Sequence, residues 1–308
     1  MKKFYFAIVV AALCMTGCGT SKKTSSSNQN EVWQTLLVKQ LDAQIENQII
    51  TVKYNNGSTL CYKILDNFGN VSLTWDHTGG RKDFNDGPSS YKGDISIPSF
   101  IVSGNNEEFV FRVMEIDQNA FYGCSEVRSI DIPFSVLRIM NDAFKGCTGL
   151  EKFTVNENNQ SYKADEDILF SKDDKMVIKY PAKKQTKEYV ISEDASFICT
   201  EAFADNTYLE KITVGNFVTA ISDYAFKNCK SLKTVELGGN VRIIGKESFF
   251  GCTNIELINS HGIFPPHNSP KVFEDVTKEN AKLYVPKMQL HNYSRRLEWS
   301  DFKNISEY

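Results

Sequence analysis

The sequence predicts a β-rich α/β solenoid with a separate cap at each end. One phrase, Ala-Phe-x-x-Cys, recurs through the chain, with Ser248 and Asn206 as single-residue variants of it. The copy at 225–229 has neighbours 23 residues before and after it, and two earlier copies, at 120–124 and 143–147, are also 23 residues apart. A fixed period between about 20 and 50 residues is typical of solenoids.

About eight mostly apolar positions recur in phase with this phrase. One repeat supplies Leu209, Ile212, Val214, Val218, Ile221, Ala225, Phe226 and Cys229. Burying each of the larger side chains contributes about 1.5–3 kcal/mol, whereas ordering the backbone costs about 1 kcal/mol or more per residue. A single repeat is therefore unstable, and the turns must stack on one another. Stacking predicts a single file of phenylalanines, formed by Phe121, Phe144, Phe203, Phe226 and Phe249.

Each repeat also contains apolar residues at a spacing of two, which is the pattern of a short strand with one buried face. The strands of successive turns should be parallel and line one side of the solenoid. The positions between the buried residues point outward and form the predicted binding face: Ser129, Asp131, Lys152, Thr154, Lys211, Thr213, Thr234 and Glu236. The alternative is that these side chains are simply solvated.

The repeated phrase continues as Cys-x-x-Leu-x-x-Ile-x-Ile, with Ile132-Pro133 after the first copy. This pattern resembles the BspA-type branch of bacterial leucine-rich repeats. It departs from the general leucine-rich repeat, in which Asn or Cys follows the strand, because here the cysteine precedes it. The resemblance covers residues 93–308 and places a leucine-rich repeat array at 113–258. It implies adhesion or protein binding, to host matrix or to partner bacteria.

An insert at 156–188 interrupts the array and also resembles that family. Residues 168–170 and 176–178 are apolar runs joined by the polar turn 171–175, which together predict a hairpin. The copies of the phrase after the insert keep the 23-residue spacing.

The N-terminus predicts export and a lipid anchor. Lys2 and Lys3 precede an apolar run at 4–15, which is too short to span a bilayer, since a helix needs roughly 20 residues. Met15-Thr16-Gly17-Cys18 resembles the lipobox of bacterial lipoproteins, whose cysteine is acylated. Residues 1–17 are therefore the predicted signal peptide, Cys18 the lipidation site, and the polar residues 18–30 a flexible tether to the outer membrane or cell surface. An ordinary secretory signal is the alternative.

Residues 31–112 predict a β-rich N-terminal cap. Trp33 to Ile45 fits either a short amphipathic helix or an extended segment. The Asn55-Asn56-Gly57 turn lies between alternating runs and predicts a hairpin, followed by a further strand from Val71. The polar loop with Asp83, Asn85 and Asp86 has only a faint likeness to a calcium loop, and its spacing does not fit an EF-hand.

Residues 259–308 predict a C-terminal cap that covers the last repeat. Their order of landmarks resembles the ending of BspA-type arrays. Leu283 and Val285 predict a final strand, and the aromatic run at 293–302 predicts a short helix folded over the end. Trp299 is expected in the core, with a ligand platform as the sharper alternative.

Six cysteines remain after Cys14 and Cys18, and four of them occupy one repeat position: Cys124, Cys147, Cys229 and Cys252. Export permits disulfides between stacked turns. Asn206 fills the same slot, however, so we expect packed free thiols rather than obligatory bridges.

No catalytic chemistry is evident in the sequence. The formal net charge is −3 without a basic block, which gives no support for nucleic-acid binding. Nucleophile-elbow, phosphate-loop, dinucleotide and zinc-helix motifs are lacking. Asp76-His77, the acidic run 165–167, and the pair His261 and His267 are weak candidates for a catalytic or metal site. We expect no enzyme activity, no cofactor and no metal.

Two main hypotheses of function follow. The first is a membrane-tethered surface protein that recognises an extracellular or host protein. The second is an accessory carbohydrate-binding lipoprotein, which predicts exposed aromatic residues gathered on the insert at Tyr162, Phe170 and Tyr180. A third, an enzyme, would require carboxylates converging in one pocket.

Overall fold

The computed structural model describes residues 40–46, 48–54, 57–78, 87–103 and 109–308, with the side chains described from residue 48 onward except at positions 103 and 109. The predicted signal peptide, Cys18, the tether and the candidate calcium loop at 83–86 lie outside these residues. Within the described part of the chain, no helix combines the length and the hydrophobicity needed to cross a membrane.

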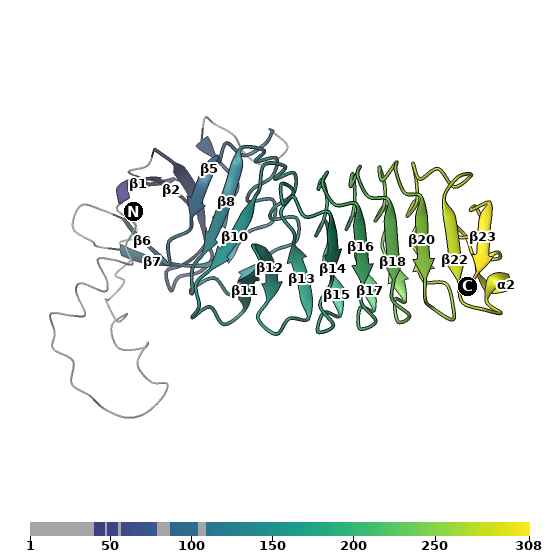
Figure 1. The fold of residues 1–308 in the computed structure, drawn as a ribbon. Coiled ribbons are helices and arrows are strands. Elements are labelled where there is room, and N and C mark those ends of the chain that lie inside the picture. Colours follow the sequence, from purple (N-terminus) through teal and green to yellow (C-terminus); the bar gives the residue numbers. More distant parts are fainter. Residues whose placement is uncertain (1–39, 47, 55–56, 79–86, 104–108) are drawn as a thin grey trace, which may run out of the picture.

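A mixed sheet, sheet A, covers the N-terminal end of the molecule (Figure 1). Four strands form an antiparallel meander: β1 (Gln40–Glu46), β2 (Ile49–Tyr54), β3 (Thr59–Ile64) and β4 (Asn70–Thr74). The sheet continues through β7 (Phe109–Ile116), which is flanked by β6 (Phe100–Ser103) and touched by β9 (Arg138–Ile139). The predicted hairpin is confirmed, and β1 shows that the extended alternative was correct over residues 40–46.

Two parallel ladders carry the outward residues that the repeats predicted. Sheet B contains β5 (Gly93–Ser96), β8 (Val127–Ile132) and β10 (Lys152–Val155). Sheet D contains β14 (Glu188–Val190), β16 (Lys211–Val214), β18 (Thr234–Leu237), β20 (Leu257–Ser260), β22 (Lys282–Val285) and β23 (Asn304–Glu307). Residues 23 apart pair in register, as Ile212 does with Val235, so the parallel ladder is confirmed. The strand at Leu283 is not the last one, because β23 adds a further parallel strand.

Sheet C runs along the array beside sheet D (Figure 1). Its first three strands are the antiparallel insert: β11 (Tyr162–Asp165), β12 (Ile168–Ser171) and β13 (Met176–Lys179). Four two-residue parallel strands then continue it: β15 (Phe197–Ile198), β17 (Ala220–Ile221), β19 (Ile243–Ile244) and β21 (His267–Asn268). The insert therefore forms the beginning of this second ladder.

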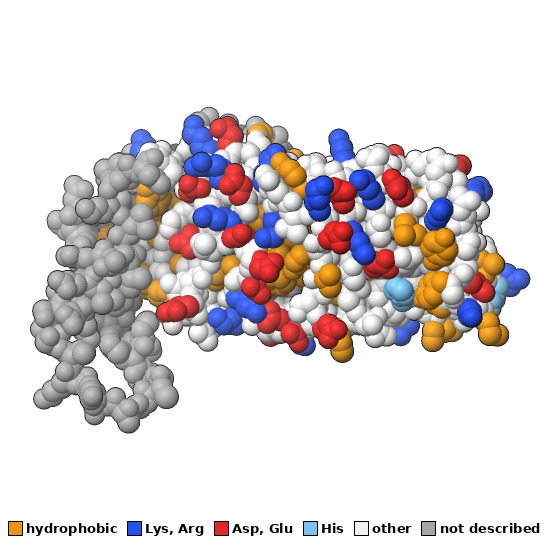
Figure 2. Space-filling view, in the orientation of Figure 1, with side chains coloured by type: hydrophobic (Ala, Val, Ile, Leu, Met, Phe, Trp, Pro, Cys, Tyr) orange, Lys and Arg blue, Asp and Glu red, His pale blue; other side chains and the backbone are white. Residues whose placement is uncertain are grey.

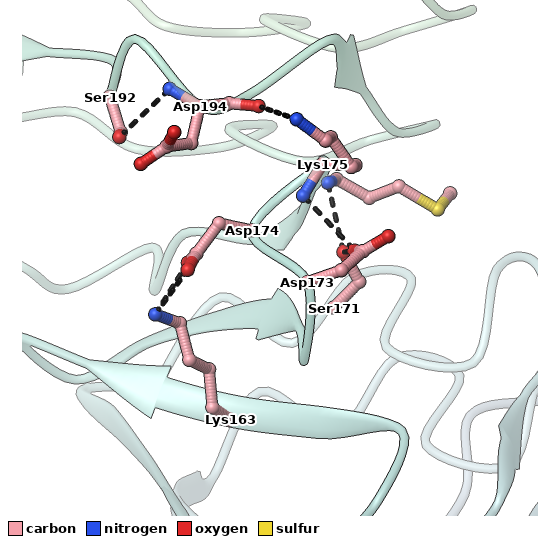
Figure 3. Close-up of polar contacts among 8 residues, drawn as sticks. Lys163, Ser171, Asp173, Asp174, Lys175, Ser192 and Asp194 are labelled. Atoms are coloured by element: carbon pink, nitrogen blue, oxygen red, sulfur yellow. Dashed lines mark hydrogen bonds and ion pairs between the residues drawn. The ribbon is translucent and has the colours of Figure 1, made fainter.

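Local hydrogen bonds fix the turn of the insert (Figure 3). The Asp173 carboxylate accepts bonds from the Ser171 hydroxyl, at 2.7 Å, and from the Lys175 backbone N–H, at 3.1 Å. Lys163 on β11 pairs with Asp174 at 2.7 Å. The Lys175 ammonium reaches the carbonyl of Asp194 on the next turn, at 3.4 Å, so the hairpin is also attached to the array.

The phenylalanines form two files rather than the single one predicted. Phe203, Phe226 and Phe249 stack with centroids 4.8 and 5.0 Å apart, and the stack extends to Tyr180 on one side and Phe273 on the other. Phe121 and Phe144 stack separately at 5.6 Å, and Phe144 then meets Phe153 edge-on. The break falls at the insert, where the core divides into two clusters.

The repeated cysteine position is a hydrogen-bonding slot. The thiols of Cys147, Cys229 and Cys252 each donate to the carbonyl of the phenylalanine 26 residues earlier, at 3.0–3.3 Å. All six described cysteines are free, and burial raises the pKa of the Cys124 thiol to about 12. Asn206 fills the slot with a stronger set: its amide donates to the carbonyls of Pro181 and Lys184 and accepts two backbone N–H groups.

The C-terminal cap is built mainly from turns. The helix α2 (Leu290–Tyr293) has only four residues, so the helix predicted over 293–302 is largely wrong. Trp299 is fully buried, contacts Phe273 and donates its indole N–H to the carbonyl of Pro266 at 3.3 Å. The core position expected for Trp299 is confirmed, and the ligand-platform alternative is wrong.

Candidate functional site

The eight predicted face residues lie on two separate sheets. Four belong to β8 and β10 of sheet B, and four belong to β16 and β18 of sheet D. All are half-buried or exposed, while the apolar residues between them are mostly buried. Figure 2 shows acidic and basic side chains interspersed along the array rather than segregated.

On sheet B, neighbouring strands satisfy one another's polar groups. Asp94 pairs with Arg128 at 2.9 Å and accepts a bond from Ser129 at 2.8 Å. Asp131 accepts a bond from Thr154 at 2.7 Å. Ion pairs at this exposure contribute little to stability, but they use up the groups that could otherwise hold a ligand.

At the residues just before strands β14, β16 and β18 of sheet D, a charge ladder follows the 23-residue period. Glu210 lies between Lys187, at 2.9 Å, and Lys233, at 2.8 Å, and these bonds lower the pKa of the Glu210 carboxyl to about 2. Glu236 accepts bonds from Asn259 at 2.8 Å and contacts the His261 ring at 3.3 Å. Four of the eight predicted face residues thus have side-chain partners on neighbouring strands: Ser129, Asp131, Thr154 and Glu236.

Sheet C carries an apolar row that the sequence analysis did not identify. The outward residues Met176, Phe197, Ala220 and Ile243 pair in register across β13, β15, β17 and β19. Met176 is 41% exposed, Phe197 46% and Ile243 53%. With strands about 4.8 Å apart, these four residues, here called the apolar row, extend over roughly 14 Å.

The apolar row exists because successive side chains in a strand point to opposite faces of the sheet. Ile198, Ile221 and Ile244 are fully buried, so the residue before each points to the opposite side of the sheet. The signal was present in the sequence as Phe197, Ala220 and Ile243 at 23-residue intervals. It was missed because the strand pattern was sought only near the Leu-x-x-Ile-x-Ile segment.

A cleft of about 130 Å³ lies where the two core clusters meet. Lys179 is buried there and donates to the carbonyl of Glu201 at 2.6 Å, while Lys145 lies 3.5 Å from the Glu201 carboxylate. Burial raises the pKa of Glu201, although both lysines act in the opposite direction. These charges compensate one another within the fold, and no nucleophile with an activating base joins them among the described residues.

The weak chemical candidates have structural roles. Asp76 is buried, and its carboxylate accepts bonds from the backbone N–H of Thr78 at 2.9 Å and from the hydroxyl of Ser90. Glu166 and Asp167 have positive φ values and make the turn between β11 and β12. In the described part of the chain, no group of three or more His, Cys, Asp or Glu side chains could hold a metal ion.

His261 and His267, the pair considered as a metal site, lie on different sheets. His261 bonds to Tyr308 at the end of sheet D, whereas His267 belongs to β21 of sheet C.

The aromatic residues predicted to form a glycan platform on the insert do not do so. Phe170 and Tyr180 are buried, and Tyr180 stacks on Phe203 inside the array. Tyr162 is half-buried, and its hydroxyl accepts the backbone N–H of Ile139 at 2.8 Å. The insert needs these rings to fill the gap in the core, so they are not available for sugar rings.

The repeat geometry corresponds to a known family. The model of the BspA type leucine rich repeat region matches six copies, at residues 96–171 and 180–266, which is more than half of the chain. The chain belongs to the BspA-type leucine-rich repeat family. No curated protein matches this family member.

Solved structures are similar to this chain at low sequence identity. A leucine-rich repeat protein from Eubacterium ventriosum superposes with a TM-score of 0.55 at 19% identity, over 80% of this chain and 84% of that chain. A leucine rich cell surface protein from Faecalibacterium prausnitzii gives 0.46 at 14% identity, over 87% and 95% of the two chains. The pneumococcal vaccine antigen PcpA gives 0.42 at 16% identity, over 87% and 98%. At 19% identity, the likeness to the Eubacterium ventriosum protein concerns the fold alone.

Proposed function

We propose that this BspA-type repeat protein is held at the outer membrane or cell surface by a lipid on Cys18 and binds an extracellular or host protein. The lipobox-like segment 15–18 and the polar residues after it support the anchor. The array then serves as a non-catalytic recognition surface.

The apolar row is the observation that carries this proposal. Three of its four side chains are exposed, and all four lie in register on one sheet, while sheets B and D present polar and charged groups. Contiguous exposed apolar residues mark interaction sites, and their burial supplies most of the affinity of a protein contact. Sugars would instead require convergent polar groups, which this row lacks.

A binding experiment on the full-length chain tests the proposal. The purified protein is titrated against an immobilised panel of extracellular matrix proteins, with neutral polysaccharides alongside. Replacing Phe197 or Ile243 with Ser should weaken saturable protein binding about thirtyfold, which corresponds to a hot spot of about 2 kcal/mol. Phe217→Ser is the matched control, because Phe217 is 59% exposed and lies outside the row.

Protein binding that survives both row substitutions, or binding to a neutral polysaccharide alone, would contradict the recognition role. The anchor is tested separately. Cys18→Ala should move the protein from the membrane fraction to the soluble fraction, and continued membrane association would contradict lipidation at that residue.

A further inference from the structure

A groove of about 530 Å³ lies at the C-terminal end of sheet C. It is bounded by the residue before β19, by the segment leading into β21, and by α2 with the turn after it. The residues that line this C-terminal groove are Val241, Arg242, Phe264, Pro265, Pro266, His267, Asn292, Arg295 and Arg296. The groove lies beyond the last member of the apolar row, because His267 pairs with Ile243.

The C-terminal groove is cationic in a protein whose formal net charge is −3. Three arginines line it, and none of its lining residues is an aspartate or glutamate. Within the described residues, Arg242, Arg295 and Arg296 form no ion pair, whereas Arg128 and Arg138 pair with Asp94 and Glu115. Guanidinium groups gathered without carboxylate partners favour an anion in the groove.

One of these arginines is already oriented. The Arg296 guanidinium donates to Nδ1 of His267, which therefore acts as an acceptor and leaves the other guanidinium N–H groups for a ligand. Pro266, the chain neighbour of His267, is anchored as well, because its carbonyl accepts the indole N–H of the buried Trp299. The C-terminal cap thus sets the positions of the Arg296 guanidinium and of Pro266.

The groove also has an apolar and a neutral polar part. Phe264 is 62% exposed and precedes two prolines, so an aromatic ring is presented to solvent beside the arginines. Asn292 adds an amide. One of its N–H groups donates to the Gln289 side chain at 2.7 Å, which leaves the second N–H and the amide oxygen for a ligand. The guanidinium groups can bind acid groups, the Phe264 ring can pack on the apolar face of a sugar, and the Asn292 amide can bond to hydroxyls. Together these groups match an acidic saccharide.

We propose that the C-terminal groove binds an acidic glycan, meaning an oligosaccharide that carries carboxylate or sulfate groups. Arg242, Arg295 and Arg296 hold the acid groups, and Phe264 packs against a sugar ring. The groove volume falls in the range of sites for small ligands, and its concave form suits a short saccharide better than a flat protein surface. This activity goes beyond the proposed protein recognition and uses different residues.

The test measures binding to the purified full-length chain by calorimetry. The probes are a sulfated heparin-derived hexasaccharide, a carboxylated galacturonate hexasaccharide, neutral maltohexaose and a hexaglutamate peptide. We expect saturable binding of the sulfated or the carboxylated saccharide, weakening as salt is added, and the two acidic probes distinguish the acid group. Arg242→Gln and Arg295→Gln should each reduce the affinity about tenfold, since each removes a charge-assisted hydrogen bond.

Arg128→Gln is the matched control, because it removes the same charge from an arginine that is paired on sheet B. Phe197→Ser should also leave saccharide binding unchanged, so failure of the apolar row and failure of the groove are distinguishable. Equal binding of hexaglutamate or of maltohexaose, unchanged affinity in both groove variants, or no binding of either acidic saccharide would overturn the proposal.

Discussion

The two halves of the array use the same repeat but pack differently. In the N-terminal half, Phe121 and Phe144 stack as a pair beside the mixed sheet A. In the C-terminal half, five rings from Tyr180 to Phe273 form a continuous file between two parallel ladders. The insert separates them, because its hairpin replaces one regular turn while keeping the later turns in phase. A regular 23-residue spacing in the sequence therefore does not guarantee that the side chains of successive turns stack without a break.

The largest loss of stability is expected from a substitution at the centre of the longer file of aromatic rings. Phe226→Ala should lower the free energy of unfolding by about 3–5 kcal/mol, because the buried ring stacks on both sides and its neighbours cannot fill the cavity. Phe144→Ala should cost less, because that ring already borders the cleft between the halves. Urea unfolding measures both, with Phe217→Ala as a surface control within about 0.5 kcal/mol. Equal losses at Phe226 and Phe144 would mean that the two halves pack equivalently.

A smaller loss of stability is expected at the repeated cysteine position, which Asn206 occupies in the first turn after the insert. Asn206→Ala should destabilise the protein by about 2–3 kcal/mol, because buried carbonyls and N–H groups lose their partners. Asn206→Cys should cost less, since cysteine fills the same position in the neighbouring turn. Thermal and urea unfolding would compare the two, with the exposed Asn254→Ala as control. If alanine and asparagine proved equally stable, the slot would be a packing position only.

The smallest change in stability is expected at the charge ladder of sheet D, where Glu210 lies between Lys187 and Lys233. The lowered pKa of Glu210 means that its contribution to stability is complete above about pH 4.5 and is lost as the pH falls through about 2. Wild type should therefore be slightly more stable than Glu210→Gln near neutral pH, and the difference should vanish toward pH 2. Unfolding midpoints measured across this range test it. A difference that stays constant down to pH 2 would contradict the role given to the two ion pairs of Glu210.

The sequence by itself determined the ladder. The recurrence of Leu, Ile, Phe and Cys at 23-residue intervals left stacking as the only stable arrangement, so the parallel strands were predictable. Local alternation likewise located the hairpins at 49–64 and 168–179. These features depend on contacts between residues that are adjacent in the chain or one repeat apart.

Only the tertiary structure decided which surfaces are free. Tyr162, Phe170 and Tyr180 could be identified as aromatic from the sequence, but whether they face solvent depended on how the insert fills the core. Arg242 and Arg296 are more than 50 residues apart, and the C-terminal cap alone brings them to one groove. Periodicity specifies the side of its own strand on which a residue lies. It does not specify which other element lies opposite, because that contact joins segments with no common period.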